Sequence, residues 1–294
     1  MLRHLSQTAE NPARAVVLGA AGFIGGAVAR KFSDAAVPVL GLGRKELDLN
    51  AADAGDRLAA LLRPDDTLVI VSARAPCKTP AMMLENIQMM AAVCAALAQK
   101  PVAHAIYMSS DAVYADGPLP LTENSPAAPG SLHGAMHVAR EQMLLAAAGT
   151  VPVALLRPTL VYGAGDPHNG YGPNRFRRLA AKREDIVLFG AGEERRDHVW
   201  IEDVAEIVVR VLLRRSTGVL NVASGAVHSF RAIADLVVSG SPHRVAIKDT
   251  PRSGPMPHNG YRPFDVTGTR VAFPDFQYTQ LADGLNKVRQ AESA

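Results

Sequence analysis

Three glycines, Gly19, Gly22 and Gly25, interrupt the first apolar stretch of the chain and set the strongest limit on its fold. Residues 14–19 are a short run rich in β-branched residues, and residues 22–32 carry apolar side chains at helical spacing. We therefore expect a strand, a tight turn and a helix. Free backbone amides at the start of such a helix attract an anion, and glycine lets the backbone approach it closely. The turn predicts a site for a phosphate-bearing ligand.

The alternation of strand and helix continues along the first half of the chain. Further strands are expected at residues 37–43, 67–73, 102–110 and 152–158, and helices at residues 51–62, at residues 80–99 and over the stretch that carries His133 and His137. Uninterrupted apolar strands that alternate with helices imply a parallel sheet with both faces covered. The fold class that we predict is α/β, a Rossmann-type doubly wound parallel sheet with a smaller C-terminal substrate-binding lobe.

The regular alternation of strands and helices in the sequence ends at about Gly163. Shorter elements follow, including a strand near residues 186–189, and residues 248–263 are expected to form a loop rich in proline and glycine. We predict a dinucleotide-binding Rossmann domain over residues 1–163 and a smaller substrate-binding lobe over residues 164–294. Residues in the range 196–225 are candidates to return to the first domain.

The amino-acid composition limits the kinds of molecule that the chain is expected to bind. The chain has 294 residues, a net charge of +3 and only 5% aromatic residues, and its basic residues are scattered. Nucleic-acid binding usually shows a concentrated basic face, so we expect an anionic small molecule instead. The longest apolar runs contain too many glycines for a membrane span, so we expect no membrane association and a cytoplasmic protein. Cys77 and Cys94 suggest neither a disulfide framework nor a metal cage.

Several further motifs follow the glycine turn in a fixed order. They are "LDL" at 47–49, "SSDAVY" at 109–114, "LRPTLVYGAG" at 156–165 and "RRDHVWIEDVA" at 195–205. In this order and spacing the chain resembles the extended short-chain dehydrogenase/reductases, the NAD-dependent epimerase/dehydratase family. The resemblance implies an enzyme that binds a nicotinamide cofactor, acts on a nucleotide-linked sugar and forms a homodimer.

The end of the second strand bears on the choice between NAD and NADP. Dinucleotide folds that use NAD commonly place an acidic side chain there, whereas this chain has Arg44. Arg44 could neutralise a 2′-phosphate, which favours NADP, or it could be a solvated turn residue. Asp48 stands where a side chain could reach the adenine.

The resemblance also assigns residues to the two ligands. The cofactor would be bound by Gly19, Gly22, Phe23, Ile24, Gly25, Arg44, Asp48, Leu49, Ala73, His137 and Pro158. The substrate would be bound by Asn174, Arg196 and Arg262. Arg196 matches the arginine that grips the nucleotide diphosphate, because a guanidinium presents a fork of donors suited to phosphate oxygens.

The catalytic positions depart from the family pattern. Ser110 falls on the serine that binds the reacting oxygen, and Asp111 matches an aspartate that some branches carry as an acid. Ala112 replaces the glutamate of the dehydratases, which makes dehydration less favoured. The family's Tyr-x-x-x-Lys is replaced by His133 and His137, one helical turn apart.

A histidine could do the work of the tyrosine. An imidazole with an ordinary pKa of about 6.5 exchanges protons near neutral pH without a cationic helper, and His137 could bind the nicotinamide ribose as the lysine does. A different chemistry on this scaffold is also open. A metal held by the two histidines would need a third ligand, which the sequence does not place, and we expect none.

The sequence thus leads to two functions. The first is an NAD(P)-dependent oxidoreductase or epimerase acting on a nucleotide sugar, with Ser110 binding the reacting oxygen and His133 or Asp111 moving the proton. The alternative is a catalytically silent or altered dinucleotide-binding protein that acts as a cofactor sensor or partner subunit.

Overall fold

A six-stranded sheet forms the larger part of the protein, for which a computed structural model describes residues 1–293. The strand order is β2-β1-β3-β4-β5-β9, and every neighbouring pair is parallel. In chain order these strands are β1 (Arg14–Leu18), β2 (Val39–Leu42), β3 (Asp66–Ile70), β4 (His104–Met108), β5 (Val153–Pro158) and β9 (Gly218–Val222).

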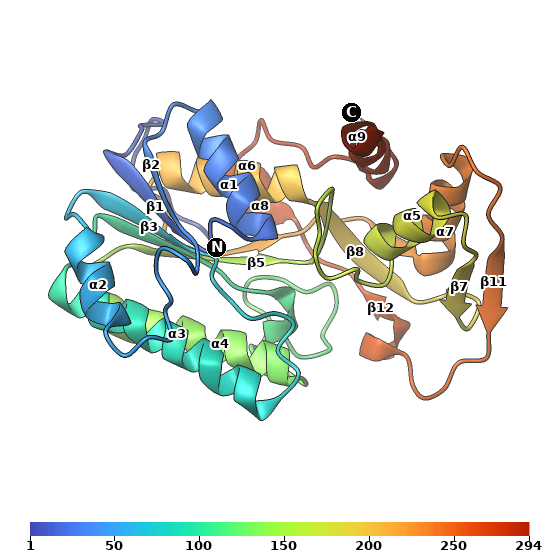
Figure 1. Ribbon diagram of the computed structural model, residues 1–294, viewed down its shortest axis with the longest axis horizontal. Coiled ribbons are helices and arrows are strands. Elements are labelled where there is room, and N and C mark those ends of the chain that lie inside the picture. The colour runs from blue at the N-terminus through green and yellow to red at the C-terminus, as the bar shows by residue number, and fades with distance from the viewer. Residues whose placement is uncertain (294) are drawn as a thin grey trace.

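Helices cover both faces of this sheet (Figure 1). One face packs against α1 (Phe23–Asp34) and α6 (Ile201–Leu213). The other packs against α2 (Ala54–Leu61), α3 (Pro80–Gln99) and α4 (Leu132–Ala148). The predicted α/β fold, a Rossmann-type doubly wound sheet, is confirmed.

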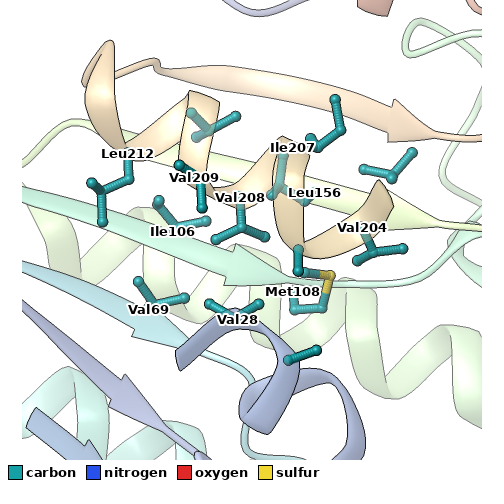
Figure 2. Packing of buried hydrophobic residues seen from close by; sticks show 14 of the residues in the cluster. Val28, Val69, Ile106, Met108, Leu156, Val204, Ile207, Val208, Val209 and Leu212 are labelled. Atoms are coloured by element: carbon teal, nitrogen blue, oxygen red, sulfur yellow. The ribbon is translucent and has the colours of Figure 1, made fainter. Parts of the chain in front are cut away.

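Branched side chains of α6 close the first face. Figure 2 shows Val204, Ile207 and Val208 of α6 together with Ile106 and Leu156 of the central strands, and all five are fully buried. Burying an aliphatic side chain of this size stabilises the fold by about 1.5–3 kcal/mol. The carboxyl ends of the central strands are therefore held rigidly.

The second, smaller unit lies beyond one end of the large sheet (Figure 1). Its strands are β6 (Leu160–Tyr162), β7 (Ile186–Phe189), β8 (Arg195–Trp200), β10 (Val227–Ser229), β11 (Ile247–Thr250) and β12 (Tyr261–Arg262). Its helices are α5 (Pro173–Ala181), α7 (Phe230–Ser239) and α9 (Leu281–Ser293). An apolar core that includes Phe176, Ile186 and Phe230 joins these elements.

The chain crosses between the two units more than once. After β8 it returns to the large unit, where α6 packs on the sheet and β9 pairs with β5. The short helix α8 (Thr267–Ala272) also contacts β9. Residues 196–225 thus contribute to both units, and the division at residue 163 remains a prediction.

Residues 248–263, expected to form a loop, contain short strands and a turn of 3-10 helix, η2 (Pro257–Gly260). β11 pairs in parallel with β7, and β12 pairs in parallel with β8. A strand of four residues with two charged side chains gives no alternating apolar pattern, so the sequence could not indicate it.

One helix, α3, is long and apolar enough by length and composition to cross a membrane, with a mean hydropathy of 1.5 over its most apolar window. In the structure it packs between α2 and α4. Met90, Val93 and Leu97 of this helix are buried against the sheet. These contacts are those of a helix that covers a sheet.

Candidate functional site

A cavity of about 1030 Å³ opens where the strands of the large sheet end. It is lined by the residues that directly follow these strands: Gly19, Gly43, Val71, Ser109 and Thr159. Ligands of open α/β sheets bind outside the carboxyl ends of the strands, where the order of connection reverses. β1 lies at such a point, between β2 and β3. The cavity therefore has the position of a cofactor site.

The glycine turn, with Gly19, Gly22 and Gly25, lines part of this cavity. Gly19 has a φ of +88°, a conformation that favours glycine. A Cβ on Gly25 would lie 2.1 Å from the carbonyl oxygen of Gly19, so only glycine lets α1 start this close to the strand. No side chain caps the first amides of α1, and its first turn carries no acidic residue. These free amides suit the pyrophosphate of a dinucleotide.

Arg44 and Asp48, which follow β2, also line the cavity. The guanidinium Nε of Arg44 lies 3.2 Å from Oδ2 of Asp48, and the Arg44 side chain is 83% exposed. The backbone amide of Asn50, together with Arg44, holds the pKa of Asp48 below its ordinary value. Arg44 is thus an exposed, charged donor at the edge of the cavity.

The segment after β4 carries two of the predicted catalytic side chains. Ser110 caps the short helix η1 (Asp111–Val113), because its Oγ accepts a hydrogen bond from the amide of Ala112 at 3.1 Å. Its hydroxyl also lies 3.4 Å from Oδ1 of Asp111. A Cβ on Gly134 would come within 2.0 Å of the Ala112 carbonyl oxygen. The first turn of α4, with His133, therefore lies directly against this segment.

His133 is half-buried at the wall of the cavity. Its Nδ1 accepts a hydrogen bond from the backbone amide of Cys77 at 3.3 Å. Burial lowers the pKa of His133, opposed by the Asp111 carboxylate and reinforced by His168. The imidazole is accordingly neutral at neutral pH.

His137 lies deeper, one turn further along α4, and also lines the cavity. The centroids of the His133 and His137 rings are 4.8 Å apart, with the rings edge to face. Nδ1 of His137 lies 2.8 Å from the hydroxyl of Tyr107 on β4. Burial, together with the neighbouring His133 and the positive charge of Arg140, keeps the pKa of His137 well below its ordinary value.

Arginines and carboxylates gather on the lobe side of the cavity. Arg196 lies 3.9 Å from Asp111 and 3.4 Å from Glu194. Arg262 is 1% exposed, lies 3.4 Å from Asp111 and pairs with Asp116. Arg196 lines the cavity, whereas Arg262 lies behind Asp111 and does not.

The cavity brings together sixteen of the seventeen side chains and backbone positions expected to bind or react, all except Arg262. Asn174 is among them, although its amide is engaged by the backbone of Gly163 and Val161. The assignment of these residues to cofactor and substrate stays a prediction.

Sequence reasoning missed several groups of the site, of which three are polar side chains close to the predicted ones. Ser72 and Asp166 line the cavity, and Tyr107 stands behind His137. In the sequence, Tyr107 is one position of a buried apolar strand, and nothing marks it as part of the site. Only the alternation of side chains along β4 could have placed it beside α4.

Among residues 1–293, no three histidine, cysteine, aspartate or glutamate side chains come together as metal ligands would. Behind the two histidines, Glu141 and Arg157 form a buried ion pair at 2.6 Å, which anchors α4 to β5.

The fold, the uncapped helix start and the cavity at the switch point define a dinucleotide-binding protein. The model of the NAD dependent epimerase/dehydratase family matches residues 15–223. The chain belongs to this family, which confirms the resemblance seen in its motifs.

Two relatives indicate which branches of the family are similar. The chain is 27% identical over 311 residues to a dTDP-6-deoxy-L-talose 4-dehydrogenase (NAD(P)(+)) of Kitasatospora kifunensis, and the match covers 96% of each protein. It is 33% identical over 123 residues to a dTDP-L-rhamnose 4-epimerase of Burkholderia thailandensis, which covers 39% of this chain and 34% of that protein.

Solved structures share the fold. UDP-glucose 4-epimerase of Thermotoga maritima, solved with UDP-glucose, is 22% identical with a TM-score of 0.82, and the match covers 95% of this chain and 98% of that one. The UDP-glucose 4-epimerase of Thermus thermophilus, solved with NAD, is 22% identical with a TM-score of 0.79, covering 95% of this chain and 99% of that one.

Proposed function

We propose that the protein is an NAD(P)-dependent oxidoreductase or epimerase that acts on a nucleotide sugar. One observation carries the proposal: the cavity that begins at the uncapped start of α1 continues to Ser110, Asp111 and the two histidines. A dinucleotide bound on the glycine turn would extend toward these side chains. The full-length similarity to an NAD(P)-dependent sugar-nucleotide dehydrogenase supports this class of substrate.

The cofactor site fits a dinucleotide. The amides of Phe23 and Ile24 would hold the pyrophosphate, and Arg44 and Asp48 would bind the adenosine half. When bound, the nicotinamide supplies hydride exchange with a sugar carbon. We propose NADP as the preferred cofactor, because Arg44 offers a guanidinium to a 2′-phosphate.

Three side chains of this chain would handle the reacting oxygen. Ser110 would bind it, and His133 or Asp111 would exchange the proton. Arg196 lines the same cavity on the lobe side, where it could meet the diphosphate of the substrate. Arg262 would then act on the substrate only through Asp111, with which it pairs.

The test is turnover by the purified protein. NADPH and NADH would each be offered with nucleoside diphosphate 4-keto sugars, and the oxidised cofactors with the corresponding sugars. We expect hydride exchange or epimerisation with at least one sugar, and loss of that activity in Ser110→Ala and His133→Ala. His243→Ala, a histidine in a loop of the lobe outside the cavity, is the matched control.

Cofactor binding without turnover on any sugar would instead support the alternative of a cofactor sensor or partner subunit. The binding measurement, by fluorescence titration with NADPH, is therefore made on the same preparation. A protein that binds neither cofactor contradicts both functions.

We also propose a homodimer in the cytoplasm. The exposed side of α3 carries four apolar side chains, Leu84, Ala91, Ala95 and Ala98, around the exposed Gln88. An apolar helix face of this kind is suited to pairing with the same face of a second copy. Light scattering of the purified protein would check it, and a monomer at micromolar concentration would contradict it.

A further inference from the structure

The hydroxyl of Tyr107 makes a single hydrogen bond within the described part of the chain, to Nδ1 of His137 at 2.8 Å. Tyr107 is 1% exposed on the central strand β4. Arg140 packs over its ring, with the guanidinium carbon 5.2 Å from the ring centroid. The hydroxyl therefore cannot turn to another partner without a change in the core.

The direction of this hydrogen bond follows from the surroundings. Burial raises the pKa of Tyr107 to about 12, so the phenol keeps its proton at neutral pH. If His137 donated through Nδ1, the phenol proton would be buried without an acceptor in residues 1–293, which is costly. Tyr107 therefore donates, Nδ1 of His137 accepts, and the imidazole proton lies on Nε2.

The tautomer of His133 is fixed in the same way, but by a different hydrogen-bond donor. The backbone amide of Cys77 can only donate, so Nδ1 of His133 must be the acceptor and its proton must also lie on Nε2. Within residues 1–293, Nε2 of neither histidine has a protein partner. Both rings line the cavity, so Nε2 is the nitrogen left for a bound molecule.

We propose that Tyr107 is a positioning residue, which holds His137 as the Nε2–H tautomer while the Cys77 amide does the same for His133. The cavity thus receives two N–H donors in place of the phenol and ammonium of related enzymes. His137 would donate to a hydroxyl of the cofactor and His133 to the reacting oxygen. These catalytic roles rest on the proposed function, whereas the tautomers do not.

The experiment is nitrogen-15 NMR of the purified full chain with labelled histidine, at pH 7.5, with and without NADPH. Signals of the pair are assigned by their loss in His133→Gln and His137→Gln. We expect both residues to show an unprotonated Nδ1 and a protonated Nε2. In Tyr107→Phe the two nitrogen shifts of His137 should move toward each other, since the tautomer is no longer fixed, while those of His133 stay.

Tyr114→Phe is the matched control. Its hydroxyl is also buried and hydrogen-bonded, to Asn221 and Arg157, but it lies outside the cavity. This variant should leave both histidine spectra unchanged. In steady-state kinetics, Tyr107→Phe should raise the KM for the cofactor about five- to tenfold with a smaller change in kcat.

A protonated Nδ1 on His137 in the wild-type protein would overturn the proposal, and the wild-type spectrum decides this even if Tyr107→Phe does not fold. Unchanged His137 shifts in a folded Tyr107→Phe would overturn it as well. The expected spectra in a protein that turns over no nucleotide sugar would refute the proposed function and leave the tautomers established.

Discussion

The two histidines differ in charge as well as in shape from the tyrosine and lysine that the resemblance in sequence leads us to expect at these positions. Burial lowers the pKa of both, so the pair is neutral at neutral pH. A neutral imidazole whose Nδ1 already accepts a hydrogen bond can donate through Nε2 but cannot take up a proton there. The proton of the reacting alcohol then needs another acceptor, and Asp111 is the carboxylate beside Ser110.

Replacement of Asp111 by asparagine tests whether Asp111, and not His133, accepts the proton. We expect Asp111→Asn to lower kcat by about 10²-fold or more, the usual contribution of a general acid or base, with the Kd for the cofactor unchanged. Stopped-flow hydride transfer and fluorescence titration measure the two quantities. Asp116→Asn, which removes the other carboxylate paired with Arg262 but lies outside the cavity, is the control. An equal loss in both variants would mean that Asp111 only neutralises Arg262.

The part of the cavity lined by Arg44 and Asp48 supports a second prediction at the same scale. Arg44→Ala should raise the Kd for NADPH roughly tenfold, about 1.4 kcal/mol, because a charge-assisted contact with the 2′-phosphate is lost. The Kd for NADH should not change. Isothermal titration measures both, with Arg57→Ala, another exposed arginine in an i,i+4 pair, as the control. An equal weakening of NADH and NADPH would place Arg44 away from the 2′ position.

Among the elements, α4 has the largest effect on the site, because it carries both histidines. Its start is fixed by Ser131, whose Oγ accepts a hydrogen bond from the amide of Gly134 at 3.1 Å. Gly134 in turn allows contact with Ala112, next to Asp111. The position of His133 therefore depends on the first turn of one helix.

Removing this cap should have two separable effects. Ser131→Ala is expected to lower the free energy of unfolding by about 1 kcal/mol, as loss of a serine cap usually does. It should also lower kcat/KM, since His133 lies in the turn that frays. Ser229→Ala removes the equivalent cap of α7, in the lobe, and should cost similar stability with unchanged kcat/KM. Urea unfolding and steady-state kinetics separate the two, and equal kinetics in both variants would argue against the role of the cap.

Elements were predictable from the sequence where local signals agreed. α3 has the bounds expected for it, because Thr79 caps it and Pro80 occupies its first turn. β11 was missed, since its partner β7 lies some sixty residues earlier in the chain and decides its conformation. Local propensity identifies helices with caps and buried strands, whereas short polar strands depend on contacts that only the fold provides.

At the scale of the whole molecule, the site joins parts that the sequence keeps far apart. The glycine turn, the end of β4 and the start of α4 follow known spacings, so their meeting at one cavity could be expected. The donor to His133 could not, because Cys77 lies 56 residues earlier, in a loop. The same holds for Arg262, which comes from the last third of the chain and lies against Asp111. Motifs predicted which residues line the site, while tertiary packing determined their hydrogen-bond partners and charge state.

Packing also makes the stability of the whole molecule depend on pH. His104, at the start of β4, is fully buried, and its Nε2 lies 2.8 Å from the carbonyl oxygen of Ser216. Burial lowers its pKa to about 4, whereas in the unfolded chain it is about 6.5. Between these values the unfolded chain binds a proton that the native protein does not. The free energy of unfolding therefore falls as the pH falls from about 6.5 toward about 4.

His104→Gln removes this titration while keeping an N–H donor for Ser216. Between pH 7 and pH 5 we expect the wild type to lose about 2 kcal/mol more of its unfolding free energy than the variant, from about 1.36 kcal/mol for each pH unit below about 6.5. Urea unfolding at several pH values measures the difference. His243→Gln, in a loop of the lobe, should keep the wild-type dependence. If His104→Gln follows the same curve as the wild type, His104 does not account for the acid sensitivity, and other histidines whose pKa is lowered by burial, such as His137 and His198, must supply it.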